Sequence, residues 1–598
     1  MLLLLLSFIA LASGTYTSEV RRLTQTLQQG FEELQQTKLF PSHLNDTLKQ
    51  LELFRMLVED REENQLEEKG LCLGCYTITN SLINERKNNI SWDVIALETI
   101  AACTISGILT PEVCKGVVDL NLPIIAYTVD ADDKVTGERM CDLFLQNAGC
   151  NSTVFEWTVD IPEGETVDKL PQSNPESTFN VLHISDLHYE PLYTAGKTKA
   201  CSEPFCCQSN QTDGDPASGT CGYWSEYTKA DSSEALIDEA IRKASEFDFD
   251  YVYFTGDIVS HRVWATSVEG NTNDLKLVFG KMKTAFNDKP IYVVLGNHEP
   301  NPENEFPLNA TVDTSLSSEW LYSLIVSEFS EWLPEEAQQD LMKGGYYSVS
   351  PRKGLRVVVL NSVLAYINNW WLNLNDVDPL GQLAWLSKTL KEAEDNGEIV
   401  HILAHIPGSK YNLLKVWSRE YHKIIERFSN TVAAQFNGHT HRDQIMVYYS
   451  SSNTSEAINV AINGASIMPD RSNPSFKIIN VDKSNFDVID TQEWTFNLTE
   501  ANESPDIDPK WYKLYSFRES YGVKSLAASE FSELLPRMAA EHSLLTNYNL
   551  FSYRNTDQAI HAGCNDACKK RYLCDMVTNQ MGDSTQCDIL CEIFDNHL

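Results

Sequence analysis

The chain is poor in positive charge. It has 47 Lys and Arg residues against 84 Asp and Glu residues, which gives a formal net charge of −37 at pH 7 over 598 residues. Nucleic-acid binding needs a basic surface that neutralises phosphates, so this composition excludes nucleic acid as a partner. The excess of carboxylates has two interpretations: a solvated surface that favours solubility, or an adaptation to an acidic compartment, where protonation relieves self-repulsion.

Long apolar runs are also scarce. After the first residues, no stretch reaches the roughly 18 uninterrupted apolar residues of a membrane span. Residues 1–14, MLLLLLSFIALASG, are short, apolar and closed by small residues, which predicts a signal peptide. We therefore expect an exported protein, secreted or lysosomal, that meets membranes only peripherally. Sequons for N-glycosylation point the same way; they are Asn45, Asn89, Asn151, Asn210, Asn309, Asn453, Asn497 and Asn502.

Fifteen cysteines in an oxidising compartment imply about seven disulfides and one free thiol. After a polar helical extension over residues 15–67, six cysteines lie in the amphipathic helical sequence of residues 68–152. They are Cys72, Cys75, Cys103, Cys114, Cys141 and Cys150. Six cysteines allow 15 pairings, and sequence alone does not choose among them.

The rest of the chain divides into three parts. Residues 153–179 are rich in Pro, Ser and acidic side chains and are predicted to be a linker. Residues 180–500 alternate strand-like and helical runs, as a layered α/β domain does, and residues 501–598 are expected to be helical.

Four of the nine remaining cysteines have a preferred pairing because vicinal cysteines seldom bridge each other. We expect Cys201–Cys206 and Cys207–Cys221 in one Gly- and Ser-rich loop. Two bridges near the C-terminus, Cys564–Cys568 and Cys574–Cys587, would leave Cys591 free.

Polar residues with metal-ligating side chains directly follow or close several strand-like runs. They lie in the frames Asp-Leu-His, Gly-Asp, Gly-Asn-His-Glu, Ala-His and Gly-His-Thr-His, and are Asp186, His188, Asp257, Asn297, His405, His439 and His441. A strand that ends in such a side chain delivers it to the rim of a sheet, where open α/β sheets place their sites. Each frame alone is common, but the series in this order predicts a metal centre. By contrast, His183 and His401 lie inside strand runs and are interpreted as core residues.

This series resembles that of the calcineurin-like metallophosphoesterases. The resemblance implies a four-layer α/β/β/α fold, with one metal held by Asp186, His188 and His441 and the other by Asn297, His405 and His439, while Asp257 bridges the two. Two cations about 3.5–4 Å apart can clamp a phosphoryl group and turn water into a nucleophile. The frame Gly256-Asp257-Ile258-Val259-Ser260 lacks the tyrosine that purple acid phosphatases need for ferric iron, and the many imidazoles favour two zinc ions.

His298 and His261 are left over from this ligand set and are candidates for proton transfer. The resemblance places both beside the scissile phosphate. We prefer His298 as the general acid, with His261 sharing that role, binding the phosphate, or being only a surface histidine. Trp370 and Trp371 fit either a substrate groove or a core.

Residues 68–152 resemble a saposin domain. The resemblance implies the nested bridges Cys72–Cys150, Cys75–Cys141 and Cys103–Cys114, and a module that binds lipid.

Residues 68–598 as a whole resemble the acid sphingomyelinases, as fragments such as DLHYEPLY, TGDIVSHRVW and AAQFNGHTHRDQ show. The chain lacks the additional disulfide that these enzymes can carry in the catalytic domain, because no cysteine lies between Cys221 and Cys564.

The function implied is hydrolysis of sphingomyelin to ceramide and phosphocholine by a hydroxide activated by two zinc ions, in a monomer whose saposin module engages the membrane. Two alternatives stay open. One is a related secreted phosphodiesterase that acts on nucleotides or other phospholipids, and the other is a non-catalytic lipid-presenting protein.

Overall fold

The computed structural model describes residues 65–163 and 177–597, except for residues 108, 152, 288, 309–312, 409–411 and 465. The expected signal peptide, nearly all of the expected N-terminal extension and the middle of the expected linker lie outside the described residues, as do the sequons Asn45 and Asn309.

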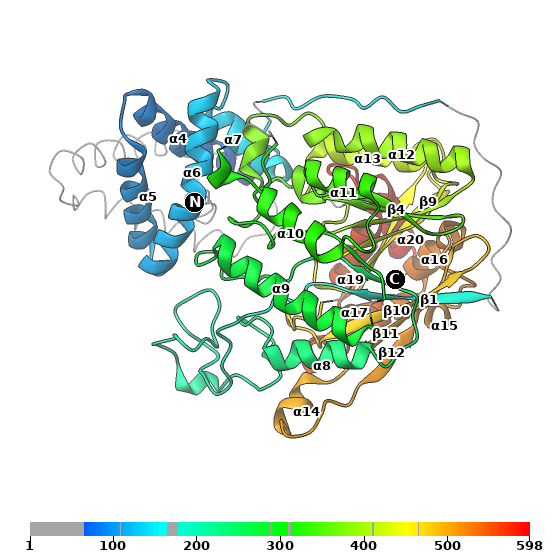
Figure 1. The fold of residues 1–598 in the computed structure, drawn as a ribbon. Helices are drawn as coiled ribbons and strands as arrows, with labels where there is room; N and C mark the ends of the chain where they lie inside the picture. Colours follow the sequence, from blue (N-terminus) through cyan, green and yellow to red (C-terminus); the bar gives the residue numbers. More distant parts are fainter. Residues whose placement is uncertain are drawn as a thin grey trace.

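Four helices form a separate module at the blue end of the chain in Figure 1. They are α4 (Gln65–Lys87), α5 (Trp92–Ser106), α6 (Pro111–Ala131) and α7 (Gly137–Phe144). Three disulfides staple them in the nested order implied by the resemblance, namely Cys72–Cys150, Cys75–Cys141 and Cys103–Cys114. Helix α6 begins at a proline, which needs no hydrogen-bond partner there, and the Thr110 hydroxyl accepts from Val113 N.

The larger part of the molecule contains two mixed six-stranded sheets. The first has the order β12-β11-β10-β1-β2-β3 and the second β4-β5-β6-β7-β9-β8. The strands of the first are β1 (Thr178–Ile184), β2 (Tyr251–Phe254), β3 (Ile291–Val293), β10 (Ser475–Asp482), β11 (Val488–Thr495) and β12 (Tyr512–Ser516). The strands of the second are β4 (Tyr347–Arg352), β5 (Leu355–Leu360), β6 (Ile399–Ala404), β7 (Val432–Asn437), β8 (Gln444–Tyr449) and β9 (Ala457–Asn463).

The two sheets pack face to face around one hydrophobic core. Tyr253 of β2 crosses between them, and its hydroxyl lies 2.9 Å from His401 Nδ1 on β6. On the outer faces, α8 (Glu234–Ala244) and α9 (Val268–Ala285) accompany the first sheet, while α12 (Gln382–Asn396) and α13 (Lys415–Arg427) cover the second (Figure 1). The result is the expected layered α/β/β/α arrangement. Every residue of β2 and β6 is buried, as is typical of parallel strands covered on both faces.

The C-terminal region is mostly helical and packs against the second sheet. Its main helices are α16 (Ala528–Ala540), α17 (His542–Ser552), α19 (Asp566–Val577) and α20 (Thr585–Asp595). Tyr548 of α17 accepts a hydrogen bond from Ile445 N of β8 at 3.0 Å, which joins the two parts. The disulfides Cys564–Cys568 and Cys574–Cys587 lie in this region, with Cys591 free beside the second, and Cys201–Cys206 and Cys207–Cys221 staple the loop after β1.

Two local features differ from the sequence-based expectations. Strand β12 falls inside the segment expected to be helical and forms the edge of the first sheet by pairing with β11. The first part of the expected linker is extended but fixed, because Val159 N donates to the Glu420 carboxylate at 3.1 Å and Arg427 donates to Pro162 O at 3.1 Å. Both partners lie on α13, so this segment is a strap across that helix. Among the described residues, no helix is long and apolar enough to cross a membrane.

Candidate metal centre

The strand ends bring the predicted ligands together at one edge of the paired sheets. Asp186 and His188 follow β1, Asp257 follows β2 and Asn297 follows β3; His405 follows β6, and His439 and His441 follow β7. Five of these residues have left-handed backbone angles, which let short loops turn their side chains inward; they are Asp186, His188, Asp257, His439 and His441. Such angles are costly for residues other than glycine and cluster at functional sites.

The first group of ligands surrounds His188. Its Nδ1 lies 2.9 Å from Val259 O, so this nitrogen carries the proton and Nε2 presents a lone pair. That Nε2 lies 3.0 Å from His441 Nε2 and 3.6 Å from Asp257 Oδ2. His441 Nε2 is in turn 3.5 Å from Asp186 Oδ1.

The second group surrounds His405. Its Nδ1 lies 2.7 Å from Thr255 O and donates to it, so Nε2 is the nitrogen available to a metal. This Nε2 faces Asp257 Oδ2 at 3.0 Å and Asn297 Oδ1 at 3.1 Å. His439 Nδ1 lies 2.9 Å from the same Asn297 oxygen. Asp257 thus belongs to both groups, as a bridging ligand would.

These donor atoms fit divalent cations. In each group, imidazole, carboxylate and amide donor atoms converge at about hydrogen-bond distance. Val259 O and Thr255 O hold Nδ1 of His188 and of His405, so that Nε2 of each ring is the atom that faces the other ligands. The carboxylates are also fully desolvated: burial raises the pKa of Asp186 to about 7 in the protein alone, so its anion needs a cationic partner.

The loops around the centre leave no room for larger residues. A Cβ atom at Gly256 would lie 2.8 Å from Gly296 N and 2.9 Å from His405 Nδ1, and its φ of +98° favours glycine independently. Glu299 fastens the same loops, because its carboxylate accepts from Gly296 N and Ile258 N, both at 2.6 Å, and from Asp257 N at 3.2 Å.

The two remaining histidines lie at the same centre. The ring of His261 is 3.9 Å from that of His188 and 4.5 Å from that of His298, measured between centroids. His261 Nδ1 lies 2.6 Å from Asp231 Oδ1. Burial lowers the pKa of His261, but the charge and hydrogen bond of Asp231 together with the charges of Asp257 and Glu303 outweigh burial, so the pKa is raised. Burial lowers the pKa of His298 to about 3. Of the two rings, His261 is the one held by a buried carboxylate, and the choice of the general acid between them stays a prediction.

Sequence reasoning missed Asp231 and Glu303. Asp231 is 1% exposed and accepts from the backbone N–H of His261, and Glu303 Oε1 is 3.2 Å from both His298 Nε2 and Asn297 Nδ2. Neither residue directly follows a strand, so the pattern of polar residues after strands, which predicted the ligands, does not identify them. Trp370 and Trp371 are both buried in a core that joins the helical module to the larger part of the molecule, where the ring of Trp370 lies 4.5 Å from that of Phe144 between centroids.

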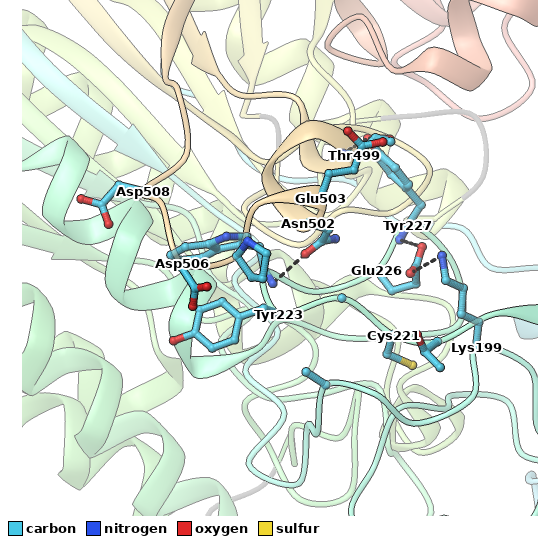
Figure 2. A pocket seen from close by; sticks show the side chains of 15 residues that line it. Lys199, Cys221, Tyr223, Glu226, Tyr227, Thr499, Asn502, Glu503, Asp506 and Asp508 are labelled. Atoms are coloured by element: carbon cyan, nitrogen blue, oxygen red, sulfur yellow. Dashed lines mark hydrogen bonds and ion pairs between the residues drawn. The ribbon is translucent and has the colours of Figure 1, made fainter.

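A cavity of about 900 Å³ lies between the disulfide-bearing loop and the chain around α14 (Leu498–Glu503). Figure 2 shows Asn502 reaching across it, where Oδ1 accepts from Trp224 N at 2.9 Å and Nδ2 donates to Ser225 O at 3.0 Å. Lys199 pairs with Glu226 at 2.7 Å on another side. No metal-ligand residue lines this cavity, so it takes no part in the centre.

Of the predicted glycosylation sites among the described residues, four are exposed: Asn89, Asn151, Asn210 and Asn453. Asn497 and Asn502 are half-buried and use their amides within the fold. Glycosylation stays a prediction.

Comparison with known proteins places this geometry in a family. Residues 179–443 match the calcineurin-like phosphoesterase model, and residues 450–589 match the model of the acid sphingomyelin phosphodiesterase C-terminal region. A sphingomyelin phosphodiesterase of Bos taurus is 31% identical over 86% of this chain and 83% of its own length. The human sphingomyelin phosphodiesterase is 30% identical over 86% and 82%. An acid sphingomyelinase-like phosphodiesterase 3b of Mus musculus is 29% identical over 66% of this chain and 86% of its own. The chain is therefore a metal-dependent phosphoesterase that belongs to the sphingomyelin phosphodiesterase family.

Proposed function

We propose that this enzyme hydrolyses sphingomyelin to ceramide and phosphocholine with two zinc ions. The observation that carries the proposal is the convergence of seven ligand side chains in two groups that share Asp257, in a chain about 30% identical over most of its length to two sphingomyelin phosphodiesterases. Asp186, His188 and His441 would hold one ion, and Asn297, His405 and His439 the other.

The bound cations would draw charge from the phosphoryl oxygens and lower the pKa of water. Two histidines of the protein would donate the proton and bind the phosphate. Asp231 holds His261 through both its ring and its backbone N–H, at 2.6 and 2.8 Å, so the imidazole is fixed and kept ready to donate a proton to the departing ceramide oxygen. His298, whose backbone N–H donates to Asp257 Oδ1 at 2.9 Å, is placed to hydrogen-bond the phosphate.

The helical module is proposed to be a saposin-type domain that engages the lipid surface. Its three nested disulfides, its apolar helix α5 and the 66% exposed side chain of Leu97 on that helix support this role. We further propose a monomeric, exported enzyme of the lysosome or the extracellular space, on the expected signal peptide, the sequons and the acidic composition.

Substrate choice can be tested on sphingomyelin liposomes and on a nucleotide phosphodiester at about pH 5, with and without a chelator. We expect chelator-sensitive release of phosphocholine from liposomes and little turnover of the nucleotide. Equal activity on the nucleotide would favour the alternative of a nucleotide phosphodiesterase, and no release of phosphocholine would favour a lipid-presenting protein.

The membrane role can be tested with Leu97→Asp. We expect slower hydrolysis of liposomes and unchanged hydrolysis of a water-soluble diester, because the charge opposes insertion of α5 but lies away from the ligands. Ile560→Asp is the matched control, since Ile560 is 53% exposed in the C-terminal region. Equal effects of the two changes would contradict a special role of α5.

A further inference from the structure

Arg554 is a buried charge that the chemistry described above does not use. It lies in the turn after α17, in the C-terminal region, and is 0% exposed. Among the described residues, no carboxylate lies within ion-pair distance of its guanidinium. Burial lowers its pKa to about 10. Burying a charge without a counter-ion costs folding free energy, so we expect the hydrogen bonds of Arg554 to serve a specific role.

The guanidinium donates its hydrogen bonds to polar atoms of neighbouring loops. Nε donates to Asn473 O at 2.7 Å, and Nη1 donates to His441 O at 2.7 Å and to Ser552 O at 3.3 Å. Nη2 donates to Ser466 Oγ at 3.3 Å. A planar fork can reach several acceptors in different directions at once, which an ammonium on a flexible stem does less well.

Two of these contacts lead to the same half of the metal centre. His441 is a proposed ligand, and its backbone has a φ of +54°, so its carbonyl is held in a conformation that needs outside support. Ser466 begins the segment that binds the other side of the site: Ile467 N donates to Ser185 O at 3.2 Å and Met468 N to Asp186 O at 3.1 Å. Arg554 makes no hydrogen bond to Asn297, His405 or His439.

We propose that Arg554 is a positioning residue for the metal held by Asp186, His188 and His441, and leaves the other metal largely unaffected. It braces the carbonyl of one ligand directly and the backbone of another through Ser466. The C-terminal region thereby contributes to the metal centre although it supplies no ligand. Arg442 donates to the same His441 carbonyl at 3.0 Å, but it is partly exposed and tied to Asp470, so it substitutes for Arg554 only in part. This inference rests on the proposed two-metal site.

The test counts zinc bound to the full-length protein and measures the affinity of each ion by competition with a chelator. For Arg554→Met, we expect one of the two ions to bind about 10–100-fold more weakly, the usual effect of losing an outer support of a ligand, and the other to bind as in the wild type. Arg554→Lys, which keeps the charge and most of the volume, should show the same selective loss to a smaller extent. Arg139→Met is the matched control, because Arg139 also donates to two backbone carbonyls, of Leu372 and Asn373, away from the ligands.

Two tight ions in the folded Arg554 variants would overturn the proposal, and so would equal loss of both ions or the same loss in Arg139→Met. Failure of both Arg554 variants to fold, with Arg139→Met folded, would also overturn it, because Arg554 would then serve the fold in general. A wild-type protein that binds fewer than two ions would instead contradict the proposed two-metal site, so the two failures are distinguishable.

Discussion

Gly116 lets the helical module touch residues 257–264, the loop that carries Asp257 and His261 and that we name the catalytic loop. Gly116→Ala should reveal what that contact does. Gly116 lies inside α6, and a Cβ atom there would lie 2.0 Å from the carbonyl oxygen of Trp264. Trp264 is buried and stands three residues after His261. A methyl group at this position must therefore push α6 and the catalytic loop apart.

The magnitude follows from two opposing terms. Alanine is favoured over glycine inside a helix by about 1 kcal/mol. Overpacking costs about 1–3 kcal/mol, and here the neighbour is backbone, which cannot rotate away. We therefore expect the variant to lose up to about 2 kcal/mol of stability. A real Cβ contact is essentially never below 3.0 Å, so the two segments must separate by about 1 Å. A shift of that size at a catalytic group can lower the rate by up to about 100-fold.

The assay compares Gly116→Ala with Gly280→Ala by thermal unfolding and by kcat on a water-soluble diester. Gly280 lies in α9, and a Cβ there meets nothing within 4 Å, so this control should be stabilised by about 1 kcal/mol and fully active. A soluble substrate removes any contribution of membrane binding. If the two variants have the same kcat and the same stability, the contact between α6 and the catalytic loop has no effect and the reasoning is wrong.

Three further predictions concern single side chains. His261→Gln should lower kcat on sphingomyelin by about 100–10,000-fold but much less on a p-nitrophenyl ester, whose leaving group needs no proton. His298→Gln should lower kcat on both substrates. Equal effects of His261→Gln on the two substrates would refute its role as the acid. Glu299→Gln replaces an acceptor of backbone N–H groups with a donor, so we expect a loss of about 1–3 kcal/mol in thermal unfolding together with weaker metal retention. Burial raises the pKa of Asp274 from 3.8 to about 7, so its ionised form opposes folding and its contribution to stability should rise as the pH falls from 7 towards 4. Asp274→Asn should therefore be more stable than the wild type above pH 7, with a difference that vanishes near pH 4. A difference independent of pH would contradict the raised pKa.

The sequence predicts the site best where metal-ligating residues directly follow strands. Asp186, Asp257 and Asn297 could be predicted as one site because the parallel strands β1, β2 and β3 end at the same edge of one sheet. His405 follows β6 of the second sheet, so its place at the same site depends on how the two sheets pack. The core role of His401 could also be predicted, since it lies within a strand run, and the structure bonds it to Phe486 O at 2.8 Å.

Other features depend on contacts between distant segments, which no local pattern encodes. Asp231 meets His261 across 30 residues of sequence, and Arg554 meets His441 across 113. Trp371 could be assigned only as groove or core from the sequence, and the partner that decides between them, Tyr127 at 5.3 Å, belongs to the helical module. Strand β12 was missed because it is short and half-exposed beside helical sequence, and its strand character comes from pairing with β11.

The central claim is that two metal ions, bridged by Asp257, drive hydrolysis of sphingomyelin. Its most direct test is a zinc titration of the metal-free protein, with release of phosphocholine from sphingomyelin liposomes as the readout. We expect no release without metal and a rise that reaches its plateau at two equivalents of zinc per chain, and we expect Asp257→Asn to abolish the rise. Full activity in the metal-free protein, or a plateau at one equivalent, would contradict the account.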